Sequence, residues 1–389
     1  MGTITTGIAG KISAVITAML MLLGPNAKQA AEQLGLDGDK WQQVTQSDKL
    51  TEPVDPVKLC SEITIGWNLG NSLDATGGSG LNTETSWGNP ATTKELILAV
   101  KDAGFDGVRI PVTWYNHTDD SFNVDEVWFE RVQAVVDYAY DEGMYVILNS
   151  HHENWNDPYE SSYKETSKKL KKLWTQIANR FESYGERLIF EGMNEPRWRN
   201  TNYEWNGGNS EGREIVNKLN ADFVSAVRAT GGNNRYRALM IPTYAASDQG
   251  LNDFTLPEDK SLIVSIHAYS PYNFAMNADG TSKFDPTKSS DTSGLTWLAD
   301  TLYNRFISKG TGAIIGECGT INKSNPDERL NWAGYFPKLF GEKGIPVFLW
   351  DNNAYGTGNE TFGLLHRNTL EWEFPNYIKK LVKTAKSVK

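Results

Sequence analysis

The chain has 389 residues and a formal net charge of −10 at pH 7, a length that suits one large barrel or two average domains. So acidic a chain is a poor binder of nucleic acid or of anionic membrane surfaces, and we expect neither as a partner. Its two cysteines, Cys60 and Cys318, are too few for a disulfide framework, although one bridge between them is conceivable. The five histidines include no His-x-x-x-His pattern, so we expect no bound metal.

The first 57 residues carry no strand pattern. Residues 12–24 form an apolar run behind Lys11, about as long as the core of a secretory signal and too short to span a membrane comfortably. We therefore expect a signal peptide over residues 1–30, a polar spacer over 31–57 and one domain over 58–389. This division predicts a secreted, extracellular protein whose mature form does not lie in a membrane. An N-terminal helix that plays no part in export is the alternative.

Strand-like segments recur eight times from residue 58 onward. Each is a short, mostly apolar run followed by a turn signal, as expected of strands buried on both faces. They cover Thr64–Asn71, Gly107–Val112, Tyr145–His152, Arg187–Pro196, Arg237–Thr243, Leu262–Pro271, Ala313–Gly319 and Pro346–Asp351.

Helical patterns lie between and after these strands. The first opens with Thr92 or Thr93 as a cap and repeats apolar residues at helical spacing. The predicted helices cover Thr93–Ala103, Glu126–Glu142, Lys164–Tyr184, Asn209–Thr230, Gly294–Ser308, Pro326–Glu342 and Glu371–Lys386, and the pattern is weakest at Ala246–Asn252. Eight such units predict an α/β fold, a single (β/α)8 TIM barrel, rather than an open doubly wound sheet. No Gly-rich phosphate loop follows any strand, which counts against a nucleotide site.

Two glutamates stand near the ends of predicted strands. The fourth strand ends in Glu195 and the seventh contains Glu317 close to its end. A buried strand has no structural use for a lone carboxylate, which is costly to bury, whereas the carboxyl ends of barrel strands carry catalytic groups. Two carboxyl groups at this rim indicate glycoside hydrolysis, with Glu195 as general acid and base and Glu317 as nucleophile. The structural alternatives are a salt bridge to Arg197 for the first and a buried ion pair with Arg109 for the second.

More polar and aromatic side chains fall near the ends of the other predicted strands. They are Asn68, Arg109, His151, His152, Asn194, His267, Tyr269 and Trp350. Arg109 beside Glu317 would hold that carboxylate ionised, and Tyr269 could donate a hydrogen bond to it. Asn194 could bind a sugar 2-hydroxyl, and Trp350 could stack on a sugar ring.

The two adjacent histidines are expected to point in different directions. If they alternate on a strand, only one of His151 and His152 can point into the mouth of the barrel, and we favour His151. His267 lies two residues before Tyr269, so the two share one face of their strand. A lone histidine on a strand is more often structural, and His267 gains weight only from its neighbours.

Together these residues resemble glycoside hydrolase family 5, a large cellulase family of retaining barrel enzymes. The matching stretches are Gly66–Ala75, Gly107–Val112, His151-His152, Phe190–Pro196, His267-x-Tyr269, Ile315–Glu317 and Phe348–Trp350, in the order of the family and over about residues 58–385. The opening stretch, with Glu84–Pro90 after it, resembles the clostridial and rumen endoglucanases, which implies a bacterial source. The resemblance implies the same roles for Glu195 and Glu317, and a reacting subsite built from the polar and aromatic residues named above.

The resemblance and the residues together predict a retaining endo-1,4-β-glucanase with an open cleft. The expected partner is a β-glucan polysaccharide, the expected state is a monomer, and no cofactor is needed because two carboxyl groups supply acid, base and nucleophile. A xyloglucanase, a mixed-linkage glucanase or a mannanase on the same scaffold is the alternative enzyme, with an exo-acting β-glucosidase less favoured. The alternative from another class is a carbohydrate-binding protein without catalysis.

Overall fold

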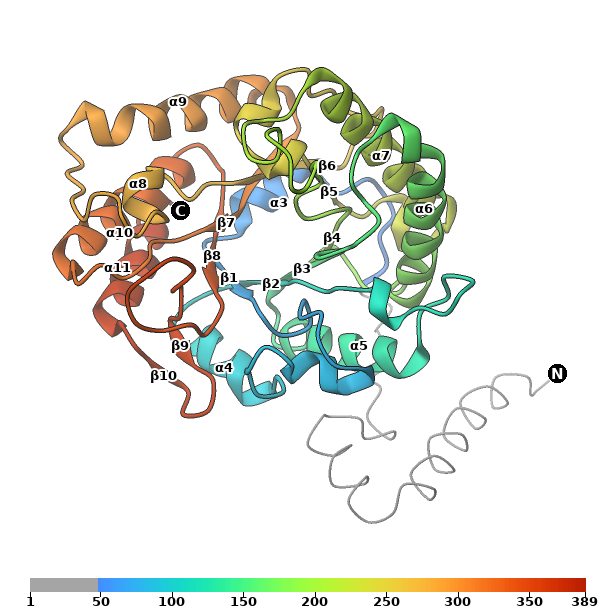
Figure 1. Ribbon diagram of the computed structural model, residues 1–389, viewed down its shortest axis with the longest axis horizontal. Helices are drawn as coiled ribbons and strands as arrows, with labels where there is room; N and C mark the ends of the chain where they lie inside the picture. The colour runs from blue at the N-terminus through green and yellow to red at the C-terminus, as the bar shows by residue number, and fades with distance from the viewer. Residues whose placement is uncertain (1–47) are drawn as a thin grey trace, which may run out of the picture.

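Residues 48–389 are described by a computed structural model (Figure 1). Eight parallel strands close into a barrel in sequence order, β8 pairing with β1, which confirms the predicted fold. Nearly every strand residue is buried, which explains the apolar runs in the sequence. The strands are β1 Gly66–Leu69, β2 Gly107–Ile110, β3 Tyr145–Asn149, β4 Leu188–Glu191, β5 Leu239–Pro242, β6 Leu262–His267, β7 Gly312–Cys318 and β8 Val347–Asp351.

Helices surround the barrel (Figure 1). The first begins where predicted, because the side chain of Thr93 accepts a hydrogen bond from the backbone N–H of Leu96. After β5, where the helical pattern is weakest, two 3₁₀ turns stand in place of a helix, η6 Tyr244–Ala246 and η7 Gln249–Leu251. The long helices are α4 Lys94–Asp102, α5 Glu126–Tyr140, α6 Tyr163–Arg180, α7 Ser210–Ala229, α9 Ser289–Arg305, α10 Pro326–Gly341 and α11 Pro375–Lys386.

The predicted start of the last helix is wrong. Glu371–Trp372 form the short strand β10, which pairs with β9, Leu365–His366. Helix α11 begins only at Pro375, where the fixed φ and the missing N–H of proline suit the first turn. The residue before a proline avoids the helical region, so a helix could not run through from Glu371.

The N-terminal end of the barrel is closed by chain that precedes β1. Helix α3, Pro56–Glu62, contacts β7, and its Leu59 and Cys60 join the apolar cluster inside the barrel. The ring of Phe348 fills part of this interior because Gly66 and Gly107 leave room for it; a Cβ atom on Gly66 would lie 2.0 Å from that ring. The core therefore runs through the barrel instead of leaving a pore.

Both cysteines are buried free thiols, so the conceivable disulfide between Cys60 and Cys318 does not form. The predicted signal peptide lies outside the described residues, as does most of the predicted spacer. The last part of that spacer is held on the barrel, since the backbone N–H of Val54 donates to Tyr236 and that of Leu50 to the side chain of Asn233. Among residues 48–389, no helix is long and apolar enough to cross a membrane.

Candidate active site

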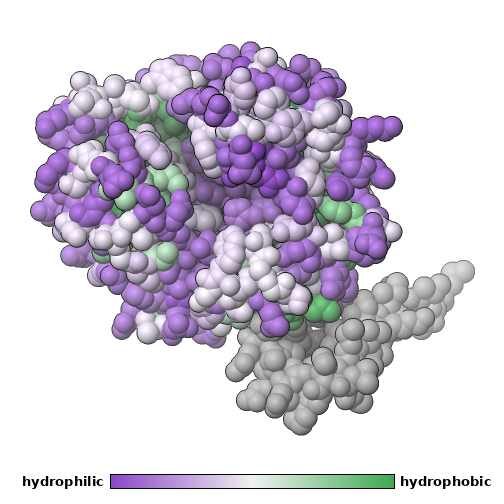
Figure 2. Space-filling model, viewed as in Figure 1, coloured by the Kyte–Doolittle hydropathy of each residue, from purple (hydrophilic) through white to green (hydrophobic). Residues whose placement is uncertain are grey.

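The face formed by the loops that follow the strands is hollowed near its centre. Figure 2 shows this hollow lined mainly by hydrophilic residues. The carboxyl ends of all eight strands converge beneath these loops, so side chains from distant parts of the sequence meet here.

Arg109, on β2, is the centre of the buried polar network. Its Nε donates to Oε2 of Glu191 at 2.7 Å, and its Nη1 donates to Oε1 of Glu317 at 2.8 Å and to Asn68 at 2.9 Å. Its Nη2 donates to the side chain of Asn194 at 2.7 Å. Burial opposes the charge of Arg109, but the two carboxylates outweigh it and raise the pKa of the guanidinium. The expected pairing of Arg109 with Glu317 is therefore present, and it occupies one of the two oxygens of Glu317.

That other oxygen of Glu317 is held by Tyr269, whose hydroxyl donates to Oε2 at 2.8 Å. Burial, followed by the charge of Glu317, raises the pKa of Tyr269 well above its usual value, so the hydroxyl keeps its proton. Glu317 is thus fixed from two directions, by a cation and by a neutral donor, and stands as a positioned anion.

Glu195 follows β4 by four residues and lies opposite Glu317. Nδ1 of His267 is 2.7 Å from its Oε1 and 3.6 Å from Oε2 of Glu317, so this ring stands between the two carboxylates. One ring nitrogen of His267 and one carboxylate oxygen of each glutamate all lie within 4.8 Å of one another. Burial raises the pKa of Glu195, but the hydrogen bond and charge of His267 outweigh it and hold that pKa below its usual range. Burial lowers the pKa of His267, and the charges of Glu317 and Glu195 raise it overall.

The two adjacent histidines both reach the mouth of the barrel. Strand β3 ends at Asn149, so strand alternation does not apply to them, and their rings are in contact with centroids 4.4 Å apart. His151 is buried and stacks parallel to Trp350 at 5.8 Å, while the more exposed His152 packs against Trp87. Burial, followed by neighbouring charges, lowers the pKa of His151 well below its usual value. Burial also lowers the pKa of His152 to about 4, although the charge of Glu195 opposes this shift, so both rings are neutral.

All ten predicted site residues gather at this end of the barrel. Asn68 lies beneath the site, and its amide donates to the backbone oxygens of Gly316 and Leu349. Trp350 stands at the rim of β8 over Gly70, where a Cβ atom would lie 2.7 Å from the indole. Glycine at this position therefore leaves the space that the ring occupies.

Two groups of donor atoms in the described chain approach the spacing of a metal site. One is the trio of Glu195, His267 and Glu317, and the other joins Asp74 to the two histidines. Glu317 already pairs with Arg109, and Asp74 accepts hydrogen bonds from two backbone N–H groups in its own turn. The carboxylates of Glu317 and Asp74 therefore already have hydrogen-bonding partners.

Glu191 belongs to the site although it was not among the predicted site residues. This carboxylate is fully buried, pairs with Arg109 through Oε2 and accepts from Ser265 through Oε1 at 2.7 Å. The amide of Asn149 also donates to it, at 3.1 Å. The fourth strand was expected to end at Glu195, but β4 ends four residues earlier, so the rule that a carboxylate at the end of an apolar strand belongs to the site applies directly to Glu191.

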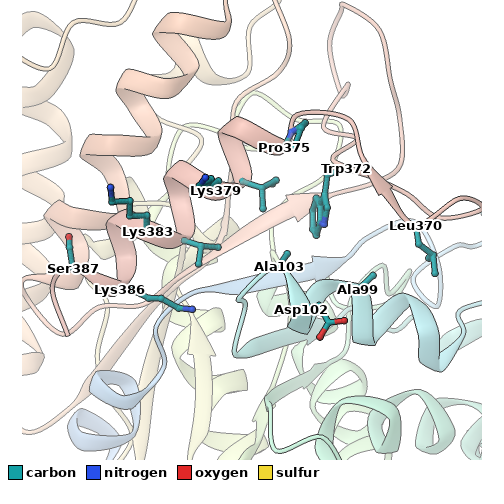
Figure 3. A pocket seen from close by; sticks show the side chains of 12 residues that line it. Ala99, Asp102, Ala103, Leu370, Trp372, Pro375, Lys379, Lys383, Lys386 and Ser387 are labelled. Carbon is teal, nitrogen blue, oxygen red and sulfur yellow. The ribbon is translucent and has the colours of Figure 1, made fainter.

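A second hollow lies on the outside of the barrel and contains none of the predicted site residues. It has a volume of about 870 Å³ and is lined by side chains of α4 and α11 together with Leu370 and Trp372 (Figure 3). Its only carboxylate is Asp102, beside three lysines of α11. A groove without a pair of carboxyl groups cannot carry out acid-assisted displacement, so the candidate active site is the hollow at the barrel mouth.

Residues 72–356 match the family described as Cellulase (glycosyl hydrolase family 5). The chain belongs to glycosyl hydrolase family 5. Within family 5, it is 46% identical to Endoglucanase A of Clostridium longisporum over 85% of this chain, and 45% identical to the Cellulase/esterase CelE of Acetivibrio thermocellus, also over 85%. It covers 66% of the first relative and 41% of the second, so it spans only part of their length.

Solved structures of family 5 agree with the barrel described here. A GH5-4 broad specificity endoglucanase from Clostridium longisporum superposes with a TM-score of 0.84 at 44% identity, covering 87% of this chain and 100% of that one. A GH5-4 broad specificity endoglucanase from Ruminococcus champanellensis, with bound cellotriose, gives 0.81 at 47% identity over 87% and 100%. These superpositions, at 44% and 47% identity, support the family 5 assignment made from the sequence match.

Proposed function

We propose that this protein is a retaining endo-1,4-β-glucanase that cleaves internal bonds of cellulose and related β-glucans by double displacement. The observation that carries the proposal is the pair of Glu195 and Glu317 at the barrel mouth, with carboxylate oxygens within 4.8 Å. Carboxyl groups about 5–5.5 Å apart are typical of retention, because no water fits between nucleophile and sugar. Relatives named endoglucanases support this substrate class.

In the first step, Glu317 attacks the anomeric carbon and forms a covalent glycosyl-enzyme as the glycosidic bond breaks. Arg109 and Tyr269 donate hydrogen bonds to its two oxygens, so the carboxylate is aimed before the sugar arrives. Glu317 loses its negative charge as the covalent bond forms. The positive charge of Arg109 is then still compensated, because Arg109 remains paired with Glu191.

Glu195 supplies the proton to the leaving oxygen and then takes one from water. Glu195 and His267 form a coupled hydrogen-bonded pair in which the pKa of the carboxyl is lowered and that of the ring is raised, so a proton held by the pair favours the ring while the site is empty. The side chain of Glu195 is 16% exposed. A sugar chain that covers it strengthens the burial effect that raises its pKa, which moves the shared proton onto the carboxylate and next to the glycosidic oxygen.

The remaining predicted residues shape the reacting subsite. We assign Trp350 as the platform for the sugar ring, with His151 stacked behind it and Asn194 directed by Arg109 toward the 2-hydroxyl. These contacts suit a neutral β-linked sugar, in keeping with the cellotriose bound by one neighbour. A related neighbour is a lichenase, which favours mixed-linkage glucan as a second substrate.

A panel of polymers tests the function. We expect wild-type protein to cause rapid loss of viscosity and slower release of reducing ends on carboxymethyl cellulose, with cello-oligosaccharides as first products. The matched blank is the double variant Glu195→Gln and Glu317→Gln, which removes both carboxylates and keeps their shape. Activity only on xyloglucan or mannan would change the substrate and keep the mechanism, whereas glucose as first product would favour an exo-acting enzyme. Binding without cleavage of any polymer would contradict catalysis.

We also propose that the protein is a secreted bacterial monomer. Cellulose does not enter cells, so an enzyme for this substrate has to be exported, as the expected signal peptide over residues 1–30 provides. Recovery of the active protein from culture medium, at the mass of one chain by light scattering, is the expected result.

Metal removal should leave the activity intact. The proposed reaction needs two carboxyl groups and no cofactor, and neighbouring donors already satisfy Glu317 and Asp74. After dialysis against EDTA, we expect the initial rate on carboxymethyl cellulose to change by less than about twofold. Loss of the activity, with recovery on adding zinc or calcium, would contradict the cofactor-free mechanism.

A further inference from the structure

The loop between β4 and α7 carries a cluster that the mechanism above does not use. Nη1 of Arg197 lies 3.5 Å from Oε2 of Glu195 and donates to the backbone oxygen of the same residue at 2.9 Å. Its Nε donates to Glu204 at 3.2 Å, and the guanidinium lies 4.0 Å from the ring centre of Trp205. Trp205 is 59% exposed, although it is one of the largest apolar side chains of the protein.

This cluster lies on the leaving-group side of the site. Oε1 of Glu195 faces His267, which in turn approaches Glu317, whereas Oε2 faces Arg197. The nucleophile marks the position of the sugar that becomes covalently bound. The acid, Glu195, lies beside the glycosidic oxygen, between that sugar and the leaving-group sugar. Residues on the side of Glu195 that is remote from Glu317 therefore face the leaving-group sugar.

On the basis of the proposed function, we infer that Arg197 and Trp205 are positioning residues. They couple binding of the leaving-group sugar to the acidity of Glu195. Trp205 offers one face of its ring to a sugar and holds the guanidinium of Arg197 against the other. Arg197 in turn places a positive charge beside Oε2. A sugar seated on the ring excludes water from Arg197 and strengthens its charge effect, which opposes the rise in the pKa of Glu195 caused by burial and so favours release of the proton to the leaving oxygen.

Several charges surround Glu195, and Arg197 is the one that the loop can adjust. The other titratable and charged neighbours come from several elements. They are His267 on β6, Glu317 on β7, Arg109 on β2, His152 after β3, Tyr269 after β6 and Glu360 after β8. Arg109 is locked between two carboxylates. Besides Glu195, Arg197 forms an ion pair with Glu204, and Asp157 also feels its charge, so removing Arg197 or Glu204 changes the charge beside the acid.

The pH profile of kcat/KM on cellopentaose tests the electrostatic part. Its basic limb reports loss of the proton shared by Glu195 and His267. A nearby cation favours the deprotonated pair, so Arg197→Gln should move this limb upward by about 0.5–1 pH unit. Glu204→Gln leaves Arg197 uncompensated and should move the limb downward. Arg180→Gln is the matched control, because this arginine pairs with Glu126 and with none of the groups around Glu195, and we expect no movement of the limb.

An activated substrate separates acid assistance from general damage. Dinitrophenyl cellobioside needs no proton on its leaving group, so its basic limb should not move in Arg197→Gln. Trp205→Ala should lower kcat/KM on cellopentaose by about tenfold to a hundredfold and on the dinitrophenyl substrate by less than about threefold, because only the former has leaving-group sugars to stack.

An unmoved basic limb in Arg197→Gln, with active wild-type enzyme, would overturn the inference and leave the proposed function standing. Movement of the limb in the same direction in Glu204→Gln, or an equal loss on both substrates in Trp205→Ala, would also overturn it. A wild type that cleaves neither cellopentaose nor the dinitrophenyl substrate would overturn the proposed function and the inference together.

Discussion

Glu317→Ala should lower kcat on dinitrophenyl cellobioside by about 10⁴-fold or more, because the covalent step loses its nucleophile. The space left by the carboxylate lies beside Arg109 and Tyr269, which both donated to it and can hold a small anion there. Added azide should therefore restore part of the rate by attacking the anomeric carbon as dinitrophenolate leaves. The product should be the glycosyl azide of inverted configuration, identified by NMR.

Glu195→Ala is the matched control, since it removes the partner carboxylate on the other face of the sugar. This variant keeps the nucleophile, so the activated substrate still forms the glycosyl-enzyme, and azide then attacks that intermediate to give the azide of retained configuration. Both variants should lose activity on cellulose. The assignment of roles would be reversed if Glu195→Ala gave the inverted product, and the double displacement would fail if neither variant responded to azide.

Arg109→Met should lower the free energy of unfolding by about 3–5 kcal/mol, in addition to abolishing activity. The side chains of Arg109 and Glu191 are fully buried and Glu317 nearly so, and one guanidinium serves both carboxylates. Removing the cation leaves buried negative charges without a partner, which is one of the largest single-site penalties in a protein. The measurement is the urea midpoint and slope at pH 7, followed by intrinsic fluorescence.

Two further variants make this prediction specific to burial. Lys218→Met breaks an exposed ion pair with Glu214 and should change stability by less than about 0.5 kcal/mol. Adding Glu191→Gln to Arg109→Met removes one of the two stranded charges and should recover part of the loss. A loss in Arg109→Met as small as that in Lys218→Met would show that the buried network contributes little to stability.

The barrel and most of its site can be predicted from patterns in the sequence. Strands buried on both faces leave continuous apolar runs, so all eight were predicted, and the rule that polar side chains gather at strand ends located Glu317 and Arg109. Local chemistry was also readable in places, as the Thr93 cap shows. The boundary before Pro375 was missed because a two-residue strand has too few residues to show alternation.

Other parts of the site depend on distances that only the folded chain defines. Strand alternation separated His151 from His152 in the sequence, but both lie beyond the end of β3, where the backbone follows no fixed period. Glu191 was not predicted as a site residue because its partners, Arg109 and Ser265, come from strands that are far away in the sequence. Arg197 lies only two residues from Glu195, and its stacking on Trp205 depends on how one long loop folds.

Helix α3 sets a practical limit on how this protein can be shortened. Leu59 and Cys60 close the barrel from below, and chain as early as Leu50 is bonded to the body of the fold. A version that begins at residue 58 keeps Leu59 and Cys60 but loses Val54 from the same apolar cluster, together with the Asp55 cap and the first turn of α3, so it would loosen the floor of the barrel even though it retains every strand and every proposed catalytic group. Minimal enzymes designed from this chain should therefore start no later than Asp48, and fusion partners belong upstream of that residue.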